Sequence, residues 1–166
     1  ITVISEGALT APLGYETSAT VAAGNVDGTT GAANVHITTG PVIAASLGSR
    51  SQTTNLIGSL SEGASVGGSY NNTVTAGTVI AFALGDNTHA TNVIGSVQGR
   101  VGGSANINVA AGDILTGTLG ERTEAETYIG SILSDVSGNA DINVIVGSIN
   151  TFAVGLSTGS DIYAKT

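Results

Sequence analysis

The chain of 166 residues contains no Cys, no Met and no Trp, and its aromatic side chains are four Tyr and two Phe. Without Cys it has no disulfide framework, no thiolate metal site and no Cys nucleophile. No segment approaches the run of about 18 apolar residues that a transmembrane helix needs. We therefore expect no membrane insertion of the mature chain and no thiol chemistry.

Charge is also scarce. Only 10% of the residues are charged, and twelve acidic against four basic side chains give a formal net charge of -8. The four basic residues are scattered: Arg50, Arg100, Arg122 and Lys165. Because no cluster of cations can neutralise a row of phosphates, the sequence predicts no nucleic-acid partner and no docking on an anionic membrane.

Small residues dominate instead, since Gly, Ala, Thr and Ser together supply about half of the chain. An enzyme core usually needs bulkier side chains and more titratable groups, so this composition indicates a repetitive structural protein. The length suits one repeat domain over residues 1–166. The chain begins at Ile1 and lacks Met, from which we expect a mature, secreted chain whose leader has been removed.

The sequence repeats with two nested periods. Leu-Gly or Val-Gly dipeptides, with Gly14, Gly48, Gly85, Gly120 and Gly155 as their second residues, recur at spacings of 34, 37, 35 and 35. A second ladder has steps of 16 to 19 residues, and an aliphatic residue follows two positions after each of its glycines. Its members are Gly7, Gly24, Gly40, Gly58, Gly77, Gly95, Gly112, Gly130 and Gly147. The unit is thus 17 to 18 residues long, and alternate units resemble each other best.

Each unit combines a short segment rich in β-branched residues with Gly, Ser, Asn and Asp, as in 107–114 (INVAAGDI) and 91–97 (TNVIGSV). This is typical of strands and turns, and only residues 121–128 suggest a helix. The pattern predicts an all-β fold, a β-solenoid of about nine units with one unit per coil. The nine glycines of the second ladder would turn its corners at positive φ. The alternative is a β-sandwich or barrel with terminal strand exchange.

Catalytic patterns are missing. His36 and His89 occupy non-equivalent places in their units, and there is no HxH or HExxH pattern, Gly-x-Ser-x-Gly elbow or phosphate-binding Gly-Lys loop. We predict that the chain is not an enzyme and uses no cofactor.

Cation binding has a weak basis in the sequence. The segments 102–106 (GGSAN) and 138–141 (GNAD) are the nearest approaches to calcium-binding solenoid turns, and both lack the spaced carboxylates. The acidic residues Glu121, Glu124 and Glu126 could hold a cation loosely, but a solvated corner is the simpler interpretation. We predict no metal site.

Ice binding is a further alternative, because flat solenoid faces with regular Thr rows can order water. Thr38, Thr75, Ala110 and Ile145 fall at one place in their units, two before a ladder glycine. This row changes from Thr to apolar residues halfway along the chain, which disfavours ice binding.

The segments 83–95 (ALGDNTHATNVIG) and 105–109 (ANINV) resemble the repeats of bacterial surface-fibre and adhesin proteins. These include curlin-like fibre subunits, holdfast-attachment proteins and haemagglutinin-type β-solenoids. The resemblance implies an extracellular structural protein that associates with itself or adheres to a surface or matrix.

We therefore predict a secreted, cell-surface subunit that assembles head-to-tail into an extracellular filament for attachment or biofilm formation. A solenoid fragment of a bacterial adhesin is the alternative. Copies of the same chain would be its partners, joined through unpaired strand edges at the two ends. The residues expected at these edges are Ile1, Thr2, Val3, Ile4, Ile162 and Tyr163.

Overall fold

A computed structural model describes residues 1–155 and 162–165. These residues form 18 β-strands and no helix, and every strand pairing between them is parallel. Residues 121–128, which could be mistaken for a helix, belong largely to a strand that begins at Thr123.

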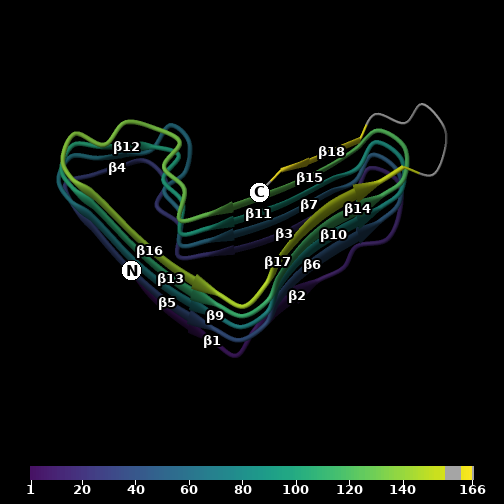
Figure 1. Ribbon diagram of the computed structural model, residues 1–166, viewed down its shortest axis with the longest axis horizontal. Helices are drawn as coiled ribbons and strands as arrows, with labels where there is room; N and C mark the ends of the chain where they lie inside the picture. The colour runs from purple at the N-terminus through teal and green to yellow at the C-terminus, as the bar shows by residue number, and fades with distance from the viewer. Residues whose placement is uncertain (156–161, 166) are drawn as a thin grey trace.

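The strands stack into three five-stranded sheets and one three-stranded sheet (Figure 1). Sheet A contains β1 (Thr2–Ser5), β5 (Ala33–Thr39), β9 (Tyr70–Ala76), β13 (Ala105–Ala111) and β16 (Ala140–Val146). Sheet B contains β2 (Ala8–Thr10), β6 (Val42–Leu47), β10 (Val79–Leu84), β14 (Ile114–Leu119) and β17 (Ile149–Val154). Sheet C contains β3 (Ser18–Ala23), β7 (Gln52–Ile57), β11 (His89–Ile94), β15 (Thr123–Ile129) and β18 (Ile162–Lys165). The short sheet contains β4 (Thr29–Thr30), β8 (Ser65–Val66) and β12 (Arg100–Val101).

The chain passes through sheets A, B and C and the short sheet in turn, then returns to sheet A, where its next strand pairs with the previous strand of that sheet. The sheet A row Thr2, His36, Thr73, Asn108 and Asn143 has offsets of 34, 37, 35 and 35 residues, the spacings of the Leu-Gly repeat. This confirms the all-β solenoid and excludes the sandwich and the barrel.

The coil is twice as long as the sequence predicted. One coil takes about 35 residues, so each 17–18-residue unit is half a coil. The described residues form four complete coils and three strands of a fifth, rather than nine coils. The reason is that only alternate units share a turn type. One half-coil holds sheets A and B, and the other holds sheet C and the short sheet.

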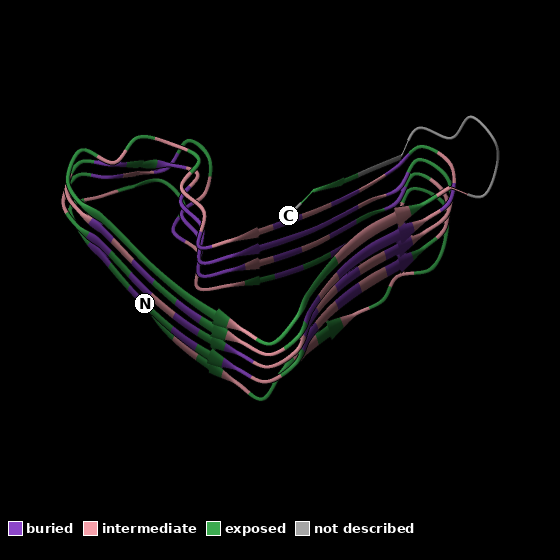
Figure 2. Cartoon of the chain, in the orientation of Figure 1, coloured by how far each residue is buried: buried purple, intermediate pink, exposed green. Residues whose placement is uncertain are grey.

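Sheet A follows the usual alternation of a half-buried strand. In β5 the residues alternate between buried and exposed along the whole strand (Figure 2). Ile37, Val74 and Val109 form one inward row that is at most 2% exposed, while Asn and Thr residues face outward. The same coil interior holds Leu60 and Val97 from the segment that leads to the short sheet.

Sheets B and C pack closely against each other through small and polar side chains. The hydroxyl oxygens of Ser46 and Thr53 lie 2.7 Å apart across this gap, and both residues are fully buried. Asn55 Nδ2 donates to Asn92 Oδ1 at 2.8 Å, so that the buried amides of two successive coils form a ladder. Beyond the first inward row of sheet B, which contains Val42, the inward side chains are short and the larger residues of the sheet point outward.

Candidate assembly surfaces

The two ends of the solenoid present strands with one unpaired edge. Strands β1, β2 and β3 lie at the N-terminal end of sheets A, B and C, and strands β16, β17 and β18 lie at the opposite end (Figure 1). An unpaired strand edge is a template for pairing with another strand. Each of the three sheets therefore has a free edge at both ends of the described chain.

The last coil also leaves part of the core uncovered. In sheet A, Ile142 and Val144 occupy the inward rows of Ile107 and Val109. Ile107 and Val109 are 1% and 2% exposed, whereas Ile142 and Val144 are 48% and 37% exposed. The same kind of side chain at the same place is thus buried in an inner coil and open to solvent in the end coil.

The structure places the edge residues predicted at the N-terminus on the outermost strand of sheet A. Thr2, Val3 and Ile4 belong to β1, and the ammonium group of Ile1 donates to the carbonyl oxygen of Asn34 at 2.7 Å. Ile4 is 79% exposed. The other two predicted edge residues, Ile162 and Tyr163, pair through their backbone with Thr123 and Glu124, and their side chains lie outside the described part of the structure.

The nine ladder glycines lie after strands, but they fall into two groups with different geometry. Four of them follow the strands of sheet C and have left-handed φ values of 55° to 61°, a conformation that favours glycine. We call them the waist glycines, because there the chain passes against the inner face of sheet A: Gly24, Gly58, Gly95 and Gly130.

The other five ladder glycines connect sheet A to sheet B, and positive φ is not their common feature. Among them only Gly7 has a positive φ, at 153°. A Cβ at Gly40 would overlap the carbonyl oxygen of Glu6, and one at Gly77 would lie 2.9 Å from the carbonyl carbon of Gly40. Here glycine allows successive coils to approach closely, as it does at the equivalent Gly112 and Gly147.

A third set of corners was not predicted. Between sheets B and C, the residue two positions after each Leu-Gly glycine has φ between 53° and 57°: Glu16, Arg50, Asn87 and Arg122. None of these is glycine, so only the Leu-Gly glycines two positions earlier, which also have positive φ, mark this turn in the sequence. Two of them also interact, since Arg50 Nη1 lies 3.1 Å from Glu16 Oε1.

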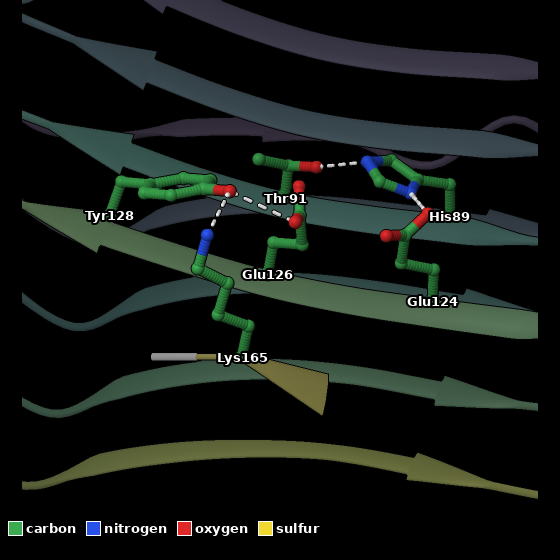
Figure 3. Close-up of polar contacts among 6 residues, drawn as sticks. All are labelled: His89, Thr91, Glu124, Glu126, Tyr128 and Lys165. Atoms are coloured by element: carbon green, nitrogen blue, oxygen red, sulfur yellow. Dashed lines mark hydrogen bonds and ion pairs between the residues drawn. The ribbon is translucent and has the colours of Figure 1, made fainter. Parts of the chain in front are cut away.

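The outer face of sheet C carries a polar cluster with members in β11, β15 and β18 (Figure 3). His89 Nδ1 lies 3.1 Å from Glu124 Oε2, and His89 Nε2 lies 2.6 Å from Thr91 Oγ1. The order hydroxyl, imidazole, carboxylate is that of an activated nucleophile. However, Thr91 is only 8% exposed, and β11 pairs on both of its edges, so its backbone amides are not available as donors to a developing oxyanion. We interpret the His89–Glu124 contact as a bond that joins neighbouring coils and the Thr91–His89 contact as one that orients the imidazole within β11.

The same cluster extends to the last described strand. Tyr128 Oη donates to Glu126 Oε1 at 2.9 Å, and Lys165 Nζ lies 5.1 Å from the centroid of the Tyr128 ring (Figure 3). Partial burial raises the pKa of Tyr128, and the bond to Glu126 raises it further, while Lys165 lowers it.

The residues considered for cation binding are separated or otherwise engaged. Glu124 contacts His89, Glu126 accepts from Tyr128, and the backbone amide of Glu121 donates to Asp86 Oδ1 at 3.0 Å. Within residues 1–155 and 162–165, no three His, Asp or Glu side chains are grouped closely enough to hold a metal ion. His36 lies on the outer face of sheet A, far along the coil from His89.

Asn ladders are the feature of the site that the sequence interpretation missed. On the outer face of sheet A, Asn71 Nδ2 donates to Asn34 Oδ1 at 2.8 Å, and Asn106 Nδ2 donates to Asn71 Oδ1 at 2.7 Å. Their spacings of 37 and 35 match the repeat of the Leu-Gly dipeptides, which is the signal that could have found them. The Thr row considered for ice binding lies on this face, where Thr38, Thr75, Ala110 and Ile145 are in register.

Comparison of the chain with protein-family models, with curated proteins and with solved structures gives no match. Its described residues form no helix long and apolar enough to cross a membrane.

Proposed function

We propose that the chain is a structural subunit that assembles head-to-tail into an extracellular filament. In this assembly, the edges of β16, β17 and β18 of one copy pair with those of β1, β2 and β3 of the next copy. The observation that carries the proposal is the combination of free parallel edges and an uncovered core row at the end of the solenoid. A second copy would continue the coil-to-coil ladder that already joins the coils inside one chain.

The end coil supplies a driving force for this stacking. Fully burying an Ile or Val side chain stabilises by about 1.5–3 kcal/mol relative to leaving it exposed. Ile142 and Val144 are 48% and 37% exposed, so covering both contributes roughly 2 kcal/mol. The new strand pairings add to this, because each replaces an edge open to solvent with a parallel ladder.

The composition supports a place outside the cell and in contact with a surface or matrix. Zero Cys and few charged side chains suit a chain whose function is assembly rather than chemistry, and the outward Asn and Thr rows of sheet A remain exposed along the filament. In the alternative, an adhesin, further coils of a longer chain would cover the ends in place of a second copy.

The edge of β1 can be blocked without disturbing its pairing with β5. The carbonyl oxygens of Ile1 and Ser5 accept from the amides of His36 and Gly40 in the β5 segment. Because N–H groups alternate in direction along a parallel strand, the amide of Ile4 points to the free edge. An Ile4→Pro substitution therefore removes a donor needed by the next copy and none needed by β5.

We expect the wild-type protein to form uniform filaments in negative-stain microscopy, and Ile4→Pro and Ile4→Lys to remain short rods with the wild-type far-UV circular dichroism spectrum. Thr75→Lys is the matched control, since Thr75 faces outward in the row of Ile4 but lies in a coil whose two edges are paired. It should form filaments. Isolated rods from wild-type protein at high concentration would refute the proposal and favour the adhesin solenoid.

A further inference from the structure

The outer face of sheet B is an apolar surface made of three rows of residues. The first row is Leu9, Ile43, Ile80, Leu115 and Asn150; the second contains Ala45, Phe82, Gly117 and Phe152; the third is Leu13, Leu47, Leu84, Leu119 and Val154. We call these residues the sheet B face. Its members at the N-terminal end are the most open, with Leu9 and Leu13 each 72% exposed.

The sheet B face differs from the other outer faces in its chemistry. It contains no ionisable side chain, and the amide of Asn150 is its one polar side chain. The outer faces of sheets A and C instead mix Asn, Thr, His and Glu residues with single apolar residues such as Ile145 and Val93. No described segment of the chain lies over the sheet B face (Figure 1). A contiguous apolar patch of this kind on a protein marks an interaction site.

In the middle row of the sheet B face, a phenylalanine ring fills the space above a glycine. Phe82 and Phe152 lie two coils apart, with Gly117 between them, and their ring centroids are 6.5 Å apart. A Cβ on residue 117 would overlap the ring of Phe152, which therefore occupies the space above the glycine. The two rings form the centre of the face, and aliphatic side chains flank them on both sides.

We propose that the sheet B face is a lateral interface at which two copies of this chain pack face to face, so that filaments associate in pairs. This inference rests on the proposed filament. The four long strands β6, β10, β14 and β17 each have six residues, about 20 Å, and with β2 the face is about 24 Å along the stack. Its footprint is thus roughly 500 Å² per copy, or about 1,000 Å² for a pair, near the lower limit of a specific interface.

This size explains why pairing should depend on assembly. A single pair of short rods buries little more than the minimum, so it associates weakly. Head-to-tail stacking extends the same three rows along the filament, and two filaments then join through many copies of the contact at once. Lateral pairing therefore becomes strong only when the filament has formed.

A second copy fits this face better than other partners do. A polysaccharide would leave its hydroxyl groups without partners, because only Asn150 offers a polar side chain. An anionic membrane would need an excess of basic residues beside the face, but the adjoining corner carries at least as many acidic as basic side chains, with Arg50 next to Glu16 and Arg122 next to Glu121. Another sheet B face is equally apolar and uncharged, so the contact would bury no ionisable side chain of the face.

The test uses Leu84→Lys, which places a charge in the third row at the middle coil, and Thr75→Lys as the control on sheet A. Far-UV circular dichroism checks that both variants fold. We expect wild-type and Thr75→Lys filaments to be paired in electron micrographs, and Leu84→Lys filaments to be single and of normal length. The Ile4→Pro rods test the face without filaments: sedimentation equilibrium should show weak dimers, and adding Leu84→Lys should weaken them more than tenfold.

The outcomes separate the two proposals. Single wild-type filaments, or pairing that survives Leu84→Lys, would overturn the lateral interface and leave the filament standing. If wild-type protein forms no filaments, the head-to-tail proposal fails. If those wild-type rods also stay monomeric at millimolar concentration, the lateral interface is overturned as well. Binding to phosphatidylcholine vesicles that is lost in Leu84→Lys, without any pairing, would assign the face to a lipid surface instead.

Discussion

Replacing Gly95 with Ala tests how the chain turns at the waist. Gly95 has φ 61°, and its amide donates to the carbonyl oxygen of Ile57 at 2.8 Å. A Cβ added there would lie 2.5 Å from Val109 Cγ2, closer than real Cβ contacts occur. The substitution therefore has two costs, a left-handed backbone and an overlap with the buried side chain of sheet A.

Two other glycines separate these costs. Gly63 has φ 79° and open space around the position of a Cβ, so Gly63→Ala carries the backbone cost alone, about 1–2 kcal/mol. At Gly31 φ is not positive and the space is also open, so Gly31→Ala should change the free energy of unfolding by no more than about 0.5 kcal/mol. Gly95→Ala adds an overpacking cost of about 1–3 kcal/mol, for a total of roughly 2–5 kcal/mol.

Urea denaturation followed by far-UV circular dichroism measures the three free energies of unfolding. We expect Gly31→Ala to destabilise the protein least, Gly63→Ala more, and Gly95→Ala most. A double variant with Val109→Ala should be more stable than the sum of the two single effects predicts, because the shorter side chain relieves the overlap. Equal losses at Gly63 and Gly95 would show that close approach at the waist is unimportant, and equal values at Gly31 and Gly63 would refute the backbone argument.

Two further predictions concern buried polar groups. Tyr70 is fully buried and its hydroxyl donates to the carbonyl oxygen of Gly58 at 2.9 Å, and burial raises the pKa of Tyr70 above its ordinary value of 10.0. The contribution of Tyr70 to stability is therefore complete below pH 10 and is lost as the pH rises above 10, by at most about 1.4 kcal/mol per pH unit. In urea titrations at alkaline pH, the difference in free energy of unfolding between wild type and Tyr70→Phe should shrink. A constant difference would contradict this. Asn92 is also fully buried and donates to Thr116 Oγ1 at 2.7 Å, so Asn92→Ala should lower the free energy of unfolding by about 1–3 kcal/mol in the same assay. The control is Asn71→Ala in the exposed ladder, which should change the free energy of unfolding by about 0.5 kcal/mol or less. Equal effects would refute the role of the buried amide.

The 35-residue spacing of the Leu-Gly dipeptides could be read from the sequence, but the sequence did not reveal that this spacing, rather than the 17–18-residue unit, is the length of one coil. Leu13 and Leu47 form a bridge between successive coils, and Leu47 pairs in register with Leu84, so the Leu-Gly spacing is the length of a coil. The second glycine ladder obscured this because it merges two kinds of glycine at nearly even steps. Left-handed glycines such as Gly95 and close-approach glycines such as Gly77 look alike in a sequence, although they serve different turns.

The sheet B face was hidden for a different reason. In β10 the inward residues are Val79, Ala81 and Ala83, and the outward residues are Ile80, Phe82 and Leu84. Both sets are apolar, so alternation gives no indication of which side faces solvent. The answer depends on sheet C, which packs so closely behind sheet B that, beyond the inward row of Val79, only small and polar side chains lie between the two sheets.

This inversion links the core to the proposed assembly. In its inner coils, sheet A keeps its large aliphatic residues inside, where Ile37 and Val74 are fully buried, and its outer Asn and Thr residues need no partner. Sheet B keeps Ala81 and Ser46 inside and turns its Leu and Phe residues outward. Large apolar residues in place of Ala81 and Ser46 would move sheet C away and break the buried Ser, Thr and Asn bonds between the two sheets. The close packing of sheets B and C therefore leaves the apolar side chains of sheet B to be covered by another molecule, and the flat, repeating surface they form is the one that another copy of the same solenoid matches.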